Sequence, residues 1–305
     1  MKIKKAVIPL VLLSSAALGE VYKYAFCRRG SRILNPIMDK KSHSPDYYVH
    51  RDSAAKALRE APQQRFTIRS ERGELLRGFY IPCGEKPCGR IAFLIHGYRS
   101  EHAEAAGMYR EYYKSRGVDL FCVDHTAAGE SEGRFIGYDV FESRDCLQWL
   151  DFLHDRFGTD IQVILHGFSM GGGTVLSMSD CCPPCVRFIV DDCGFSGPID
   201  SLRQRLGLLV WPLAAINRVV AGYSLREGDV RPHLRRAKLP ILFVHGTEDH
   251  TVPLAMGKEL YDMYHGPKDC LFVEGAHHVE SMHRAPEAYA AKLDGFIHKY
   301  IEVAK

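Results

Sequence analysis

A serine between glycines follows an apolar run in the middle of the chain. Residues 167–171 read GFSMG and come directly after IQVIL at residues 161–165. This pattern predicts a strand that runs into a tight turn, because bulky residues flanking the serine would collide with the neighbouring strand and helix. A serine hydroxyl exposed at the tip of such a turn becomes a nucleophile when a nearby base takes its proton. Ser169 is therefore the candidate nucleophile.

An acid and a pair of histidines follow later apolar runs. Asp249 comes shortly after the run at residues 241–244, and the histidine pair 277–278 follows the next run. The order serine, acid, histidine along the chain is the one that the α/β-hydrolase fold uses. We expect Asp249 to orient a histidine that takes the proton of the serine. Asp191 and Asp192, after an earlier strand, are the rival positions for the acid.

The sequence HGY at residues 96–98 closes another apolar run. A glycine turn at the end of a buried strand aims a backbone N–H at the place where an oxyanion develops. We expect the backbone N–H groups of Tyr98 and Met170 to form this oxyanion hole. His96 is expected to support the loop and to take no part in the chemistry.

Together these motifs resemble those of serine α/β-hydrolases, in particular bacterial membrane-anchored hydrolases near the serine aminopeptidase and prolyl oligopeptidase-like families. The resemblance covers residues from about 65 to 302 and implies that His278, rather than His277, is the base. In one loop, Thr126 stands where relatives often have an arginine, which leaves open how that loop is braced. The shared motifs are HGY at 96–98, GESEG at 129–133, GFSMGG at 167–172, DCGF at 192–195, HG at 245–246 with Asp249 and VP at 252–253, and GAHH at 275–278 with Ser281.

Strand and helix patterns alternate along the chain and predict an α/β fold, with a mostly parallel sheet between helices. Active sites in such sheets lie at the carboxyl ends of the strands, where these motifs fall. Residues 196–236 interrupt the alternation, which predicts a small helical lid inserted in the hydrolase domain. The expected strands are 65–69, 74–81, 90–95, 118–123, 161–165, 187–190, 240–244 and 270–273, and the expected helices include 53–60, 101–115 and 139–157.

The amino terminus has a basic start followed by an uncharged, mainly apolar stretch at residues 6–19. This pattern is typical of secretory segments, and extension to residue 26 gives about the length of a membrane span. Residues 1–29 therefore predict a signal anchor that holds the catalytic domain outside the cytoplasm at the cell membrane. Cleavage of the segment, giving a secreted protein, is the alternative. Residues 30–64 are expected to form a stalk and a lead-in helix.

The 305-residue chain has a formal net charge of +3 and ten cysteines. So small an excess of basic residues argues against a nucleic-acid partner. The CxxC pair Cys182 and Cys185 has no second ligand pair, so we predict no metal site. The spacing of Cys83 and Cys88 permits a hairpin disulfide in an oxidising compartment. The oligomeric state is left open.

The motifs predict hydrolysis of an ester or related acyl bond in a small-molecule substrate, through a Ser-His-Asp triad and an acyl-enzyme, with neither metal nor organic cofactor. A peptidase of the serine aminopeptidase type is one alternative; against it, the chain has no propeller domain and no identifiable acidic pair for a peptide amino terminus. A non-catalytic binding protein with a hydrolase fold is another. The apparently complete triad argues against it.

Overall fold

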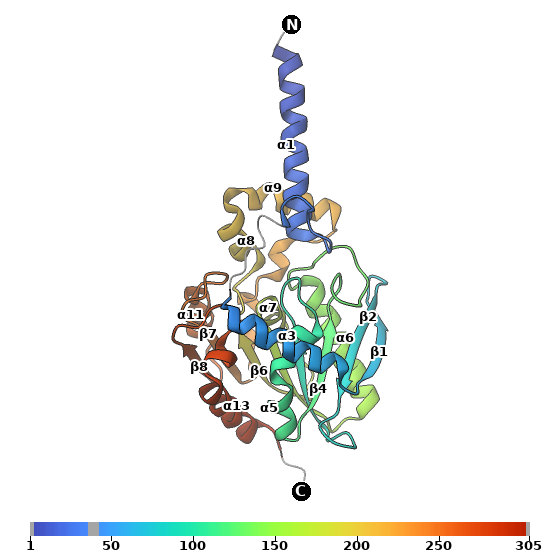
Figure 1. The fold of residues 1–305 in the computed structure, drawn as a ribbon, viewed down its shortest axis with the longest axis vertical. Helices are drawn as coiled ribbons and strands as arrows, with labels where there is room; N and C mark the ends of the chain where they lie inside the picture. The colour runs from blue at the N-terminus through green and yellow to red at the C-terminus, as the bar shows by residue number, and fades with distance from the viewer. Residues whose placement is uncertain (1–2, 36–42, 303–305) are drawn as a thin grey trace.

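One sheet lies at the centre of the computed structural model, which describes residues 3–35 and 43–302 (Figure 1). Its central strands are buried and rich in Val, Ile, Leu and Phe because helices cover both of their faces. In the described part of the chain the eight strands are β1 (Gln64–Arg69), β2 (Leu75–Ile81), β3 (Arg90–Ile95), β4 (Asp119–Asp124), β5 (Gln162–Phe168), β6 (Val186–Asp192), β7 (Ile241–Gly246) and β8 (Lys268–Val273).

The order of the strands is β1-β2-β4-β3-β5-β6-β7-β8. Strand β2 is antiparallel to both β1 and β4, and all later pairs from β4 to β8 are parallel. The predicted mostly parallel sheet is therefore confirmed, and β1 and β2 form an antiparallel hairpin at its start. The carboxyl ends of β3, β5, β7 and β8 lie at the same edge, so this topology brings together residues that are far apart in sequence.

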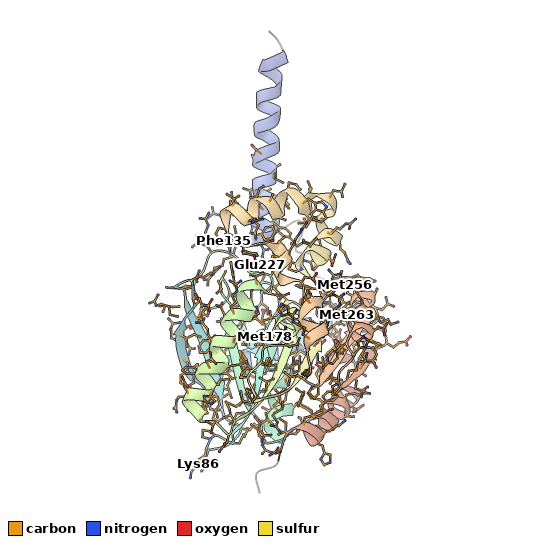
Figure 2. The ribbon with its side chains drawn as sticks, turned by 180° about the vertical axis from the view of Figure 1, so that it is seen from behind. Lys86, Phe135, Met178, Glu227, Met256 and Met263 are labelled. Carbon is orange, nitrogen blue, oxygen red and sulfur yellow. The ribbon has the colours of Figure 1, made fainter. Side chains whose placement is uncertain are left out.

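Two groups of helices cover the two faces of the sheet. On one face, buried side chains of the helices pack on strand residues such as Phe93 and Leu165; Figure 2 views the molecule from behind, with Met178 at the centre of this packing. These helices are α6 (Val140–Phe157), α7 (Met170–Ser177), α10 (Arg231–Arg236) and α11 (Leu254–Met263). The other face is covered by α3 (Pro45–Glu60), α4 (His102–Ala106), α5 (Arg110–Ser115) and α13 (Pro286–Tyr300), after the short α12 (Ser281–Arg284).

The helix expected at residues 101–115 is broken by a short 3-10 turn, η1 (Gly107–Tyr109). Helix α3 crosses at this point, and a Cβ atom on Gly107 would lie only 2.6 Å from the backbone carbon of Ala54. Gly107 therefore permits a close approach between backbones that any larger residue would block. Helix α3 is also longer than the expected stretch 53–60 and buries Leu58 against the sheet face.

A helical insertion connects β6 to β7 and lies over the carboxyl ends of the strands (Figure 1). Its apolar run is divided: Val210 and Leu213 are buried, whereas Leu208, Leu209 and Trp211 are exposed. The insertion contains α8 (Pro198–Leu206), η2 (Gly207–Leu209), α9 (Val210–Val220), η3 (Leu225–Gly228) and α10.

Helix α1 (Ile3–Phe26) contacts α9 through its carboxyl end and extends away from the body beyond it (Figure 1). Within the described residues, no helix has both the length and the apolar character needed for a membrane span. This finding contradicts the predicted signal anchor, the transmembrane attachment and the localisation outside the cytoplasm that depended on it. The apolar side chains at the end of α1 pack on protein instead: Tyr22 and Phe26 are buried, and the Tyr22 hydroxyl donates to Asn217 Oδ1 at 3.2 Å.

We expect Phe26→Ala to lower the free energy of unfolding by about 3 to 5 kcal/mol, because it leaves a cavity in a well-packed cluster. The Phe26 ring is fully buried between Tyr22, at 5.0 Å between ring centroids, and Tyr138, at 5.5 Å. Urea unfolding followed by circular dichroism measures the change. Val219→Ala, at a side chain 85% exposed on α9, is the control and should change stability by less than about 0.5 kcal/mol. Equal stability of the two variants would show that α1 does not pack on the body.

Candidate active site

Ser169 occupies the tight turn between β5 and α7. Its φ of 55° lies in the left-handed region, which non-glycine residues rarely adopt and which costs free energy. A Cβ atom on Gly167 would lie 2.0 Å from the carbonyl oxygen of Gly171, and one on Gly171 would lie 2.0 Å from the carbonyl oxygen of Ile95. Both glycines are therefore required for the turn to form, and the turn leaves the serine half-buried rather than enclosed.

The three residues predicted as a triad lie in one hydrogen-bonded line. Ser169 Oγ is 2.8 Å from His278 Nε2, and His278 Nδ1 is 2.6 Å from Asp249 Oδ2. Asp249 follows β7 and His278 follows β8, so adjacent strand ends bring them together. A carboxylate holds the proton on Nδ1, which leaves Nε2 free to accept the serine proton. The arrangement matches the geometry that general-base activation of a serine requires.

The carboxyl group of Asp249 is itself held in place. Its Oδ1 accepts hydrogen bonds from the backbone N–H groups of Thr251 at 2.8 Å and Val252 at 2.9 Å. Burial raises the pKa of Asp249, but the charge and hydrogen bond of His278 outweigh this effect, and the pKa lies below its usual value. Asp249 is thus kept ionised, the state in which it stabilises an imidazolium.

The rival acids make hydrogen bonds elsewhere. Asp192 accepts from the hydroxyl of Tyr289 at 2.9 Å and from that of Tyr109 at 3.3 Å. Asp191 accepts from the backbone N–H of Gly194 at 3.0 Å. Burial raises the pKa of Asp191 to about 7 and that of Asp192 to about 6. Neither carboxyl group takes the place of Asp249 beside the imidazole.

The second histidine of the pair is turned away from the serine. Nδ1 of His277 lies 3.1 Å from the backbone oxygen of Glu248, and this contact is exposed. Glu248 is exposed as well. The structure therefore brings His278, but not its neighbour His277, to Ser169.

The loop after β3 lies against the serine turn. A Cβ atom on Gly97 would be 3.2 Å from Cβ of Ser169. His96 is buried beneath the loop, with Nδ1 2.7 Å from the oxygen of Gly97, and burial lowers the pKa of His96, which favours its neutral form. The phenol of Tyr98 donates to the carbonyl oxygen of Tyr24 at 2.8 Å, so its side chain is turned toward α1. The backbone N–H of Tyr98, and not its side chain, is therefore the group that can serve the expected oxyanion hole.

Met170 is the first residue of α7. Backbone N–H groups in the first turn of a helix have no partner within the helix, and they lie at the positive end of its dipole. The N–H of Met170 belongs to the residue directly after the serine. It is therefore available to a negative oxygen that forms beside Ser169.

The loop that carries Thr126 is braced by hydrogen bonds to buried acidic groups. The Thr126 hydroxyl donates to Asp145 Oδ2 at 2.6 Å, and both residues are buried. Asp124 accepts from the backbone N–H of Glu130 at 2.7 Å, and the hydroxyl of Ser131 donates to the backbone oxygen of Asp124 at 2.5 Å. These hydrogen bonds hold the loop in place with Thr126 at the position where an arginine was expected.

Glu142, fully buried near this network, should make stability depend on pH. Burial raises the pKa of Glu142 to about 7, although the Gly137 N–H donates to it at 2.8 Å. Between the unfolded pKa, about 4.3, and the folded pKa, only the unfolded state has lost the proton, so the free energy of unfolding falls as pH rises and then levels off. We expect the free energy of unfolding of the wild type to fall by about 2 to 3 kcal/mol between pH 5 and pH 8 because of this group, and we expect this fall to be absent in Glu142→Gln.

Urea unfolding of both proteins at pH 5 and pH 8 measures this difference. Glu71→Gln, at an exposed position, is the control and should leave the pH dependence of stability unchanged. A pH dependence in Glu142→Gln equal to that of the wild type would contradict the assignment to this carboxyl group.

A cavity of about 850 Å³ opens above the serine and contains both Ser169 and His278. Several arginines line it, and no motif in the sequence indicated that they belong to the site. They come from separated segments, so no spacing pattern connects them, and only the folded arrangement reveals them. The lining residues are Tyr24, Arg28, Asn35, Tyr48, Arg51, Tyr98, Arg99, Ser100, Ala127, Ala128, Gly129, Ser169, Arg205, His250, Thr251 and His278.

The ten cysteines, all within the described ranges, are free thiols. Asp119 accepts from the backbone N–H groups of both Cys83 and Cys88, at 2.8 and 2.9 Å, which closes the turn between them. The turn is therefore held without a covalent link.

Two family models match parts of the chain, and both describe hydrolases. Residues 86–220 match the family model for serine aminopeptidases of family S33, and residues 186–288 match the model for serine hydrolase (FSH1). A protein named YqkD from Bacillus subtilis is 24% identical over 241 residues, which cover 76% of this chain and 78% of YqkD. These matches confirm the resemblance to serine hydrolases near the serine aminopeptidase family.

Solved structures confirm the fold. The esterase Pf2001 from Pyrococcus furiosus superposes with a TM-score of 0.65 at 18% identity, covering 81% of this chain and 96% of the esterase. The α/β hydrolase GrgF from Penicillium sp. sh18 superposes with a TM-score of 0.63 at 14% identity, covering 79% of this chain and 99% of GrgF. At identities this low, the superpositions show that the fold is shared.

Proposed function

We propose that this chain, which has the α/β-hydrolase fold and resembles serine hydrolases, cleaves an ester or related acyl bond of a small-molecule substrate. One observation carries the proposal: Ser169 Oγ, His278 and Asp249 form a continuous hydrogen-bonded line with spacings of 2.8 and 2.6 Å, at the tip of a strained turn. Strain at such a position persists where the surrounding structure enforces it, and it occurs often at active sites.

In the proposed reaction His278 Nε2 takes the proton of Ser169 as Oγ attacks the acyl carbon. The negative oxygen of the tetrahedral intermediate accepts hydrogen bonds from the backbone N–H groups of Tyr98 and Met170. His278 then gives the proton to the leaving group, and an acyl-enzyme remains on Ser169. Water, deprotonated by the same imidazole, attacks the acyl carbon; the bond to Ser169 Oγ breaks, the acid is released, and the imidazolium returns the proton to Oγ. Asp249 stabilises the imidazolium in both halves.

The charge of the cavity favours an ester over the substrate of an aminopeptidase. A free peptide amino group is a cation, and a site that binds it needs a carboxylate nearby. The described residues that line the cavity include arginines but neither Asp nor Glu. We therefore favour ester hydrolysis over the aminopeptidase alternative.

The test is labelling of the full-length protein with a fluorophosphonate probe, followed by mass spectrometry of the modified peptide. The proposal expects one adduct, on Ser169, and hydrolysis of p-nitrophenyl esters with little turnover of aminoacyl p-nitroanilides. An adduct on another residue, or faster turnover of the anilides than of the esters, would contradict it.

A further inference from the structure

Arginine side chains from four separated parts of the chain line the cavity above Ser169. They are Arg28 after α1, Arg51 on α3, Arg99 after β3 and Arg205 on α8. The described lining residues include neither Asp nor Glu. Such a concentration of one sign of charge in a concave site attracts ligands of the opposite sign.

Not all of these guanidinium groups are neutralised by a neighbouring acid. Arg51 lies 2.7 Å from Asp52 Oδ1 and is thereby paired. Arg28 donates to the backbone oxygens of Ser131 and Gly129. Throughout residues 3–35 and 43–302, no carboxylate lies within ion-pair distance of Arg28 or Arg205.

Arg205 lines two cavities that both contain Ser169. It lies in the last turn of α8 and lines both the main cavity and a narrow recess that also contains Ser169, Tyr138 and Leu202. Burial raises the pKa of Tyr98 to about 12, and the positive charge of Arg205 is among the charges that oppose this rise, which puts the guanidinium near the oxyanion loop. An anion bound by Arg205 would therefore lie in the same cavity as an acyl group that Ser169 attacks.

We propose that the substrate carries an anionic group, a carboxylate or a phosphate, which Arg205 binds, with Arg28 at the rim, while Ser169 attacks the acyl carbon. Arginine suits this role because its planar guanidinium donates two parallel hydrogen bonds to either group. This inference rests on the proposed function and names the class of substrate for that same site.

Matched ester pairs test the proposal in the full-length protein. The first pair is 3-acetoxybenzoate and its neutral methyl ester, which places the charge on the leaving group. The second pair is monophenyl adipate and phenyl methyl adipate, which places the charge on the acyl group. A third arm, 3-acetoxyphenyl phosphate, compares phosphate with carboxylate. We expect kcat/KM for the charged member of at least one pair to exceed that of its neutral partner by about tenfold or more.

Arg205→Gln should reduce this charged-to-neutral ratio about tenfold, as expected when a charge-assisted hydrogen bond is lost. Arg203→Gln is the matched control, because Arg203 lies on the same helix and does not line the cavity. The ratio should also fall when NaCl is raised from 50 to 500 mM. A wild-type ratio below about two in both pairs, or a ratio unaffected by both Arg205→Gln and Arg28→Gln, would overturn the inference.

A binding measurement separates this inference from the proposed function. Calorimetry of Ser169→Ala with 3-acetoxybenzoate and with 3-acetoxyphenyl phosphate reports recognition of the anion without turnover. We expect saturable binding of at least one of them, weakened about tenfold when Arg205→Gln is added. Binding without ester turnover by the wild type would reject the proposed function alone, and turnover of neutral esters without binding of either anion would reject the anion site alone.

Discussion

Ser169→Ala is expected to lower kcat/KM for p-nitrophenyl esters by about 10⁵ to 10⁶-fold and to abolish fluorophosphonate labelling. The variant removes the oxygen that lies 2.8 Å from His278 Nε2 and keeps the Cβ atom, so the packing around the turn is unchanged. The hydroxyl is half-buried and contributes little packing, so the melting temperature should stay within a few degrees of the wild type. Steady-state kinetics, probe labelling and calorimetric unfolding together measure these three effects.

Ser115→Ala is the control for this result. The Ser115 hydroxyl donates to the backbone oxygen of Tyr112, on the helix α5 away from the site, and its loss should leave kcat/KM within about twofold. Ester hydrolysis at the wild-type rate by Ser169→Ala would refute the serine mechanism. A large loss of melting temperature would instead show that the hydroxyl has a structural role.

The second large effect concerns the groups behind the serine. His278→Ala and Asp249→Asn should each lower kcat by about 10⁴-fold, because one removes the base and the other leaves it in the wrong tautomer. His277→Ala should lower kcat by less than about tenfold, because Nδ1 of that ring lies beside the backbone oxygen of Glu248 and not beside Ser169. The adjacent histidine thus provides a control of the same residue type in the same loop.

Steady-state kinetics of the three variants with one activated ester test these assigned roles. If His277→Ala were the inactive variant, or if Asp249→Asn kept near wild-type turnover, the assigned roles would be wrong. The double variant His278→Ala with Asp249→Asn should be no slower than His278→Ala alone, because residues that act as a unit are not additive.

Local patterns were sufficient to predict the sheet and the neighbourhood of the triad. The strand at 161–165 and the glycines after it determine a turn that needs no distant contact, and parallel strands place their carboxyl ends at one edge. Asp249 and His278 follow adjacent strands, so their meeting with Ser169 follows from topology. Their chemical roles remain predictions until the variants are measured.

The errors have a common physical cause. Apolar side chains can be buried against protein as well as in lipid, and at the carboxyl end of α1 Tyr22 contacts Asn217 and Phe26 is buried. The break at Gly107 likewise depends on α3, which approaches from about fifty residues away in sequence. The four arginines of the cavity are brought together by the convergence of four separate backbone segments. Each of these features is set by tertiary contacts, which periodicity does not encode.

Five of the sixteen residues that line the catalytic cavity precede the sheet. They include Tyr24 on α1, Arg28 just after it, and Tyr48 and Arg51 on α3, whereas the family match to serine aminopeptidases begins only at residue 86. Substitutions in this leading segment can change which substrates enter while the strand ends that carry the triad stay the same. Substrate selectivity in proteins built this way can therefore diverge during evolution independently of the catalytic apparatus, and two relatives with superposable sheets need not share a metabolite.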